Sequence, residues 1–460
     1  MKKRSSNDDA LLDNRLAFVD QALFAAQRAT GRKEVIQCVW VYEHPIDFDG
    51  VRRFQHNLSH GLLGRRIERS PLPFARNRWV SDRTPPDVNI AECARPRAEL
   101  SDWADECAQL PIDPERGPGW RLDFLPMTDG STAVSLVVSH YLIDGIGLAI
   151  ALADAIMGNK RGLDYPPPNS RGRLQAVVQD ARRTARDAPE VARALGVAAR
   201  QARRRWNGDA EPPASRPVAP GGSDDRGGSE DVIVVPTITV YIDLQEWDAR
   251  AAALGGAPHT LVSGLAAKLG ERIGRRRAGD GLVTLQLPMN ERVDGDTRAN
   301  AMAFARASVD PARVTTDLRG VRAAINQALK TMRETPDESL QFLWLTHFMP
   351  KRALKRLSDA LSDDPDQPIF CSNLGDLGSV LCRLDGTDAE YVTARVVRQH
   401  VTRQWLDRTG GQMIVQSWRI RDKVMTTVAA YQPGAENTRA ALGELAASTL
   451  AEFGLAGEIS

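Results

Sequence analysis

One segment of the chain places a histidine at the junction between a predicted strand and a predicted helix. Residues 132–138 form a short apolar, β-branched run, which is typical of a strand buried in a sheet. Ser139 and His140 follow this run, and Asp144 and Gly145 precede an apolar helical segment. A strand, turn and helix in this order hold an imidazole at a rigid edge, where a carboxylate can fix its tautomer. A histidine that merely satisfies a hydrogen bond at a strand end gives the same pattern.

The length, charge and cysteine content restrict the class of protein. With 460 residues the chain is too long for one ordinary core, so we expect two domains or one bipartite unit. The formal net charge of +1 predicts no nucleic-acid partner. The 5 cysteines are scattered without a Cys-x-x-Cys pair, which argues against a disulfide framework and a zinc site. His56 and His60 lie one helical turn apart but need further ligands, so we predict no metal site.

The sequence also lacks the signals of export or membrane insertion. The first residues are basic, but no apolar core follows them, so we predict no signal peptide. The longest apolar stretch, Ile146–Met157, contains Asp154 and is far shorter than the roughly 20 residues that span a bilayer. We therefore expect a cytoplasmic protein with at most peripheral contact to membranes or lipid droplets.

The first part of the chain, residues 1–165, mixes helices and strands as a layered α/β or α+β domain does. The turn at Asp129 and Gly130 predicts a hairpin between the last two strands. The expected elements are helices at 14–30, 51–63 and 100–110 and strands at 35–42, 120–126 and 132–138.

Composition changes abruptly in residues 166–230. Residues 174–206 are helical in pattern and rich in arginine, and residues 207–231 are rich in Gly, Pro, Ser and Asp, as in a disordered connector. The basic helix is either a solvated helix face or a contact surface for an anionic membrane. Because aromatic residues are not interleaved with the arginines, a single-strand nucleic-acid binder is not indicated.

Residues 231–460 again offer helices and a mixed sheet, so the two halves resemble each other in kind without an exact repeat. The expected strands lie at 232–241, 282–287, 369–372, 412–419 and 424–431, and the expected helices at 244–254, 260–277 and 314–335.

Four short stretches occur in a characteristic order: residues 118–120 (Pro-Gly-Trp), 139–145 (Ser-His-Tyr-Leu-Ile-Asp-Gly), 287–300 and 372–375 (Ser-Asn-Leu-Gly). This order resembles the CoA-dependent acyltransferase superfamily, which includes chloramphenicol acetyltransferases, condensation domains of nonribosomal peptide synthetases and polyketide-associated acyltransferases. It is most similar to the bacterial wax ester synthase/diacylglycerol acyltransferase branch. In that branch a Pro-Leu-Trp motif precedes a His-His-x-x-x-Asp-Gly motif, and a Ser-Asn-x-x-Gly segment lies in the second half.

The resemblance implies an α/β (α+β) fold of two chloramphenicol-acetyltransferase-like lobes that meet in a V, with an active-site tunnel at their junction. It implies an acyltransferase of lipid or secondary metabolism that moves an acyl group from acyl-CoA, as co-substrate, to a hydroxyl-bearing acceptor without a cofactor. Two alternatives stay open. One is a condensation-type or polyketide-associated enzyme that uses an acyl carrier protein thioester. The other is a non-catalytic, acyl-binding relative.

The resemblance also assigns roles within the histidine motif. His140 matches the second histidine and would be the general base that removes a proton from the acceptor. Gly145 would leave space for substrate beside the histidine, since a side chain there would crowd the tunnel. Ser139 replaces the first histidine of the family motif, which weakens the case for fine positioning and favours the non-catalytic alternative.

Asp144 would act structurally in such a family member, by orienting the motif through an arginine. The sequence offers Arg76, Arg78 and Arg292 as partners for it.

Three further residues are assigned to the substrate or the oxyanion. Ser372 and Asn373 would supply hydrogen bonds near the oxyanion, although a strand-end turn would use the same residues. Asn300 stands where relatives carry a Gly-Asn pair. After Gly375 this chain has Asp376 where the wax ester branch has proline, so the identity of the acceptor stays open.

Overall fold

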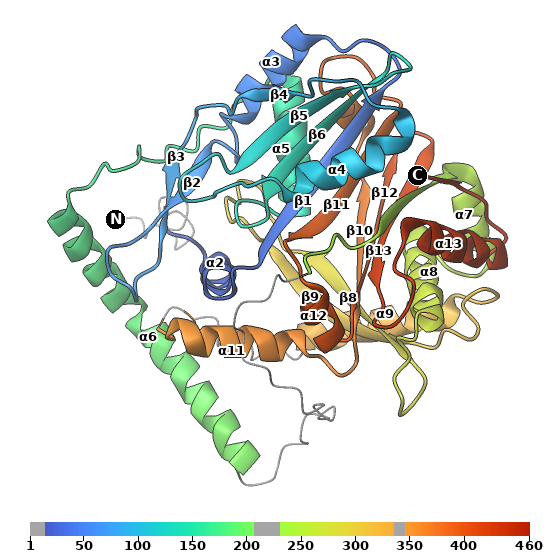
Figure 1. Cartoon of the computed structure of the whole chain (residues 1–460). Helices are drawn as coiled ribbons and strands as arrows, with labels where there is room; N and C mark the ends of the chain where they lie inside the picture. Colours follow the sequence, from blue (N-terminus) through green and yellow to red (C-terminus); the bar gives the residue numbers. More distant parts are fainter. Residues whose placement is uncertain (1–13, 207–230, 335–345, 347) are drawn as a thin grey trace, which may run out of the picture.

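The computed structural model describes residues 14–206, 231–334, 346 and 348–460, which fold into two large sheets with helices packed on them (Figure 1). In spatial order, the first sheet contains β11 (Tyr391–Gln399), β1 (Lys33–Tyr42), β6 (Thr132–Ser139), β5 (Trp120–Pro126) and β4 (Val88–Ile90). The second sheet contains β14 (Glu458–Ile459), β7 (Thr237–Asp243), β13 (Lys423–Tyr431), β12 (Gln412–Ile420), β10 (Ile369–Asp376), β8 (Val283–Asn290) and β9 (Met302–Val309). Strands β2 (Arg65–Glu68) and β3 (Arg78–Ser81) pair separately.

Helices and short 3₁₀ turns connect the strands. In the first half of the chain they are α2 (Phe18–Thr30), α3 (Phe48–Leu58), η1 (Arg97–Glu99), α4 (Leu100–Gln109), α5 (Gly145–Met157) and α6 (Arg173–Trp206). In the second half they are α7 (Leu244–Ala253), α8 (Pro258–Arg272), α9 (Arg319–Glu334), α11 (Lys351–Ser362), η2 (Ser379–Cys382), α12 (Arg403–Arg408) and α13 (Arg439–Glu452). We call each sheet with its covering helices a lobe.

The first sheet is buried on both faces. Successive side chains of a strand point to opposite sides, and each side packs in a separate core. Ile36 and Trp40 of β1 pack in the core shared with α3 and α5. Val35 and Val39 pack in a second core against α4. Helices α7, α8, α9 and α13 share one core with the second sheet, and Trp418, Ile420 and Met425 of that sheet pack in the core of the first lobe. This two-layer burial explains why β1 and β6 read as almost continuous apolar runs.

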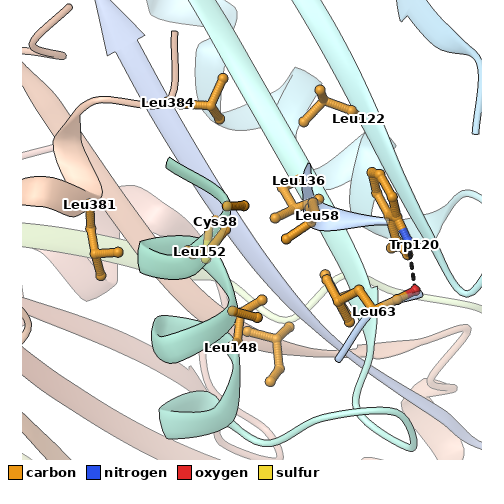
Figure 2. Packing of buried hydrophobic residues seen from close by; sticks show 14 of the residues in the cluster. Cys38, Leu58, Leu63, Trp120, Leu122, Leu136, Leu148, Leu152, Leu381 and Leu384 are labelled. Atoms are coloured by element: carbon orange, nitrogen blue, oxygen red, sulfur yellow. Dashed lines mark hydrogen bonds between the residues drawn. The ribbon is translucent and has the colours of Figure 1, made fainter. Parts of the chain in front are cut away.

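The hairpin expected across Asp129 and Gly130 is present, since β5 and β6 pair antiparallel along their length. Gly130 has a positive φ of 88°, which a glycine adopts without strain. At the start of β5 the indole N–H of Trp120 donates to the carbonyl of Leu63 at 3.2 Å, and both residues belong to a cluster of buried leucines (Figure 2).

Strand β11 corrects the expected domain boundaries. We expected residues 231–460 to form a lobe of their own, but β11 leaves the second half and pairs antiparallel with β1 in the first sheet. The indole N–H of Trp40 also donates to the carbonyl of Leu381, at 2.7 Å. The exchange covers the edge of β1, whose backbone groups would otherwise lack partners. Because the paired strands are far apart in sequence, local patterning does not reveal it.

Most other expected elements are present with bounds shifted by a few residues. The helix expected at 51–63 ends at Leu58, and the helix expected at 314–335 starts at Arg319. Strand β9 was not expected, because alanines occupy its buried positions 305 and 307 and give only a weak apolar signal. Helices α11, α12 and α13 were also not expected from the sequence.

Helix α6 is one element of 34 residues that extends away from the two sheets (Figure 1). Its aspartates tie the helix to earlier parts of the chain, since Asp180 accepts from the Ser70 hydroxyl at 2.6 Å and Asp187 pairs with Arg15 at 2.8 Å. Its exposed arginines include Arg182, Arg186 and Arg193. The expected connector at 207–231 lies, except for its last residue, outside the described residues. No helix within the described ranges is long and apolar enough to cross a membrane.

Candidate active site

A cavity of about 810 Å³ lies where the two lobes meet. Its wall includes His140, Asp144 and Gly145 from the histidine motif and Ser372 and Asn373 from β10. Residues from both halves of the chain, predicted separately as site residues, therefore share one cavity.

The wall has an apolar part and a more polar part. The apolar part includes Ile36, Cys38 and Trp40 of β1, Leu148, Ala149 and Leu152 of α5, Val392 and Val396 of β11, and Trp418 and Ile420 of β12. The polar part includes His259 and Ser263 of α8, Asn290 of β8, Asn326 of α9, and Arg395, Gln416 and Arg419 of β11 and β12. Such a cavity can hold a ligand with a long apolar segment and a polar reacting end.

Asp144 joins the two lobes through Arg292, one of its three expected partners. The guanidinium Nη2 lies 2.8 Å from the Asp144 Oδ2, and both side chains are at most 4% exposed. Asp144 Oδ1 accepts from the Gly147 backbone N–H at 2.7 Å and caps α5, while Oδ2 also accepts from the Ala301 N–H at 2.8 Å. One carboxylate thus satisfies a helix end and a loop of the second lobe.

Arg76 and Arg78, the other two candidates, are used elsewhere. Arg76 lies 3.3 Å from Asp187 of α6, and Arg78 pairs with Glu68 at 2.7 Å.

The two glycines after Asp144 have different roles. A Cβ on Gly147 would lie 2.9–3.0 Å from atoms of Ile143, Asp144 and Arg292, so only glycine leaves room for the salt bridge. A Cβ on Gly145 would meet only Leu374, at an ordinary 3.5 Å. Protein packing therefore does not require glycine at position 145, and the expectation that a side chain there crowds the substrate stays a prediction.

Ser139 and Asn300 do not line the cavity, although we placed both at the site. Ser139 is buried as the last residue of β6, and its N–H donates to the Gly119 carbonyl at 2.9 Å. The Asn300 amide donates to Asp20 Oδ1 at 3.1 Å and, at 3.4 Å, to the backbone carbonyl of His140. The expected contact of Asn300 with substrate is wrong, since its side chain is buried and supports the loop that carries His140.

Two further residues, which the sequence did not indicate, hold the segments around His140: Asp20 binds residues 299–300, and Arg65 binds the turn after His140. The Asp20 carboxylate of α2 accepts the backbone N–H groups of Ala299 and Asn300 at 2.9 and 2.8 Å. Burial raises the pKa of Asp20, while these hydrogen bonds oppose the shift. Arg65, almost fully buried against Trp79, donates to the carbonyl of Leu142 at 2.8 Å. A motif search does not find such residues, because each is a single polar position in an ordinary segment.

Ser372 and Asn373 both reach the cavity, but they are not equivalent. Ser372 is buried, whereas Asn373 is exposed and its Oδ1 accepts the N–H of Gly375 at 2.9 Å. This bond closes the turn that we considered as the alternative role for the pair. Ser372 is therefore the better placed hydrogen-bonding group for a reacting atom.

The Pro-Gly-Trp stretch contacts the end of β6 and the turn that carries His140. A Cβ on Gly119 would lie 2.2 Å from the Leu142 side chain, so a larger residue would force Leu142, in the turn after β6, to shift. The Gly119 carbonyl also receives the Ser139 N–H, which fixes the end of β6 next to His140.

The thiols in the cavity wall are not suited to nucleophilic catalysis. Burial raises the pKa of Cys38 and of Cys371 to about 12 in each case, so both remain protonated near neutral pH. His259 also reaches the cavity, and burial together with the nearby Arg322 lowers its pKa, so that its imidazole is neutral near pH 7. In the described parts of the chain, no group of three His, Cys, Asp or Glu residues is arranged to hold a metal ion.

The two-lobed architecture and the position of His140 define the class of fold. The chain has the fold that condensation domains share with CoA-dependent acyltransferases, as its motifs predicted. The first condensation domain of the CDA synthetase superposes with a TM-score of 0.54 at 14% identity, over 97% of this chain and 99% of that domain. The wax ester synthase/diacylglycerol acyltransferase of Marinobacter aquaeolei VT8 gives 0.53 at 15% identity, over 96% and 100%.

Sequence comparison finds relatives that match over part of the chain. Two curated Mycobacterium tuberculosis proteins, whose own names as diacylglycerol O-acyltransferases are provisional, are 28% identical to this chain over 176 residues. The match spans 36% of this chain and only 34% of each relative. No protein-family model matches the chain.

Proposed function

We propose that the protein is an acyltransferase that moves an acyl group from an acyl-CoA thioester to a hydroxyl acceptor, with His140 as the general base. The observation that supports this most directly is the place of His140, on the wall of a large and mainly apolar cavity between two lobes. The Asp144–Arg292 salt bridge, which ties the turn after His140 to the second lobe, supports a fixed position for the imidazole.

The proposed reaction needs no covalent enzyme intermediate. The acceptor oxygen attacks the thioester carbonyl carbon while His140 takes its proton, and the carbonyl π electrons move to the oxygen. When this tetrahedral oxyanion collapses, the carbonyl re-forms and the C–S bond breaks. The thiolate then takes the proton from the imidazolium and leaves as the free thiol. Ser372 is a buried hydroxyl in the wall that can donate a hydrogen bond to the oxyanion.

The apolar wall supports a substrate with a long acyl chain. Trp40, Leu152 and Trp418 are almost fully buried apart from the surface that they present to the cavity. Burial of each methylene of an acyl chain against such a wall contributes about 0.8 kcal/mol. The wax ester synthase in the comparison and the two mycobacterial relatives are named for lipid acyl transfer, which supports a lipid or a similarly apolar acceptor.

The test is an assay of purified protein with labelled acyl-CoA donors of increasing length and a panel of alcohols and acylglycerols. We expect transfer that His140→Ala abolishes without loss of the folded state. Activity only with acylated carrier protein would assign the chain to the condensation type, whose fold it shares equally well. Tight acyl-CoA binding without turnover for any acceptor would make it a non-catalytic relative and refute the proposal.

We also propose that α6 brings the protein to an anionic lipid surface. Its exposed arginines lie on a helix that also exposes Leu174 and Val178, which are 77% and 41% exposed. Arginines beside exposed apolar residues are typical of a helix at a membrane interface. Flotation with vesicles that contain anionic lipid, compared with neutral vesicles, tests this contact.

A further inference from the structure

Three neighbouring strands carry a row of charged and titratable side chains that ends at His140. In the β1–β6 pairing, Val35 lies opposite Ser139, and the N–H of His140 donates to the Glu34 carbonyl at 3.0 Å. The same register therefore places Glu34 opposite His140. In the β1–β11 pairing, Glu34 lies opposite Arg398. Side chains at directly opposed positions of antiparallel strands stand on the same face of the sheet.

The face in question is the one that lines the cavity. Side chains alternate along a strand, so Glu34 shares its face with Ile36 and Arg398 shares its face with Val396. Both apolar residues line the cavity. The strand register thus puts Glu34 and Arg398 on the sheet face that carries Ile36 and Val396, at the end of the strands next to His140.

Within this row Glu34 and Arg398 are paired. The guanidinium Nε donates to Glu34 Oε1 at 2.8 Å, and Arg398 also lies over the Trp405 ring at 5.3 Å. Burial favours the neutral form of Glu34, but the charges of Arg398 and His140 hold its pKa below the usual range. Glu34 is therefore an anion near neutral pH that is bound to Arg398 and lies opposite His140 in the strand register.

We propose that Glu34 is a positioning residue for the general base, which stabilises the imidazolium of His140, and that Arg398 holds the Glu34 carboxylate in place for this task. The inference rests on the proposed function. An anion beside the base lowers the energy of the state in which the base carries the substrate proton. This arrangement supplies an acidic partner to a histidine whose motif has serine in place of the first histidine.

Other charged groups surround this row and must be included in its titration. They are Arg32 and Tyr141 beside Glu34, Arg408 of α12, and Asp359 of α11, which pairs with Arg32 and Arg408. Asp359 forms ion pairs with Arg32 and Arg408, whereas Arg398 forms its ion pair with Glu34.

The matched control is Glu115, a partly buried glutamate that pairs with Arg28 at 2.6 Å away from the cavity wall. We expect Glu34→Gln to lower kcat roughly tenfold or more with KM changed less than about twofold. We expect Glu34→Asp to retain much of the rate and Glu115→Gln to leave both constants unchanged. Equal effects of Glu34→Gln and Glu115→Gln would overturn the inference.

A readout independent of turnover separates this inference from the proposed function. In NMR titration of the imidazole signals, assigned by the loss of one signal in His140→Ala, Glu34→Gln should lower the midpoint of His140 by at least about half a pH unit. Glu34→Asp, which keeps the negative charge, should leave the midpoint near that of the wild type. An unchanged midpoint in folded Glu34→Gln refutes the inference. Turnover that survives His140→Ala refutes the proposed function and with it the role of Glu34, whereas turnover lost in His140→Ala together with an unchanged midpoint in Glu34→Gln refutes the inference alone.

Discussion

The Arg292 guanidinium of the second lobe lies 2.8 Å from the Asp144 carboxylate of the first, and both side chains are buried. The pair sits four residues beyond His140 and caps the helix that follows it. Because removal of one partner would leave the other charge buried, the bridge couples the junction of the lobes to the stability of the histidine turn.

This coupling predicts a large effect of Asp144→Ala on stability. Loss of the carboxylate leaves the buried Arg292 without its counter-charge and the Gly147 and Ala301 N–H groups without their acceptor, which should cost about 3–5 kcal/mol of unfolding free energy. Denaturant unfolding measures this cost. The exposed Arg319–Asp317 pair is the control, and its removal should change the unfolding free energy far less. A stable Asp144→Ala protein with normal turnover would contradict the structural role.

A pair of glycine substitutions distinguishes packing from substrate access. Gly147→Ala should destabilise the fold, because its Cβ would press on Asp144 and Arg292. Gly145→Ala should leave the melting temperature within a few degrees, because its Cβ meets only Leu374 at an ordinary distance. Thermal unfolding of both variants checks this order. A greater loss of stability in Gly145→Ala would show that Gly145, and not Gly147, is the tightly packed position.

The apolar wall predicts control of acyl length. Ala149 of α5 lines the cavity beside Leu148 and Leu152, so Ala149→Leu should shorten the longest acyl chain accepted by roughly two to three methylenes. Competition between labelled acyl-CoA donors of different length measures the shift, and circular dichroism monitors the fold. An unchanged length profile in a folded variant would place the acyl chain elsewhere.

The ion pair of Glu34 predicts a pH dependence of stability. The folded state holds the pKa of Glu34 below its ordinary value, so the unfolded chain takes up the proton first as the pH falls. The stabilisation is present above the unfolded pKa, near 4.3, and is lost as the pH falls through the folded pKa. Wild type should therefore exceed Glu34→Gln in unfolding free energy at pH 7, and the difference should shrink towards pH 3. A constant difference would show that burial, not charge, is responsible.

The buried contact between Asp20 and the 299–300 loop predicts a second stability effect. Asp20→Ala removes the acceptor of two backbone N–H groups and of the Asn300 amide, which should cost about 2–4 kcal/mol. Asp123, equally buried and bound by Asn89 at 2.8 Å, is a control within the first sheet. Both variants should lose stability, but only Asp20→Ala should reduce turnover. An equal loss of turnover in the Asp20→Ala and Asp123→Ala variants would show that Asp20 has no specific role in supporting His140.

The sequence by itself determined the local features of this protein. Apolar runs fixed β5 and β6, the Asp129-Gly130 turn fixed their hairpin, and the order of short motifs fixed the two-lobed fold and the place of His140. These features depend on neighbouring residues, so a local pattern carries them. For the arginine that binds Asp144, the sequence offered three candidates. It shows which side chains are charged but not which of them lie close together.

Only the tertiary structure decided which residues meet across the junction. In the structure, Arg292 is the arginine that binds Asp144, and the Asn300 side chain donates to the backbone carbonyl of His140. Strand β11 of the second half pairs with β1 of the first. The tertiary structure also placed Glu34 beside His140, although 106 positions separate them in the chain. Such partners are set by strand register and by the need to pair every buried polar group, and both depend on the whole fold.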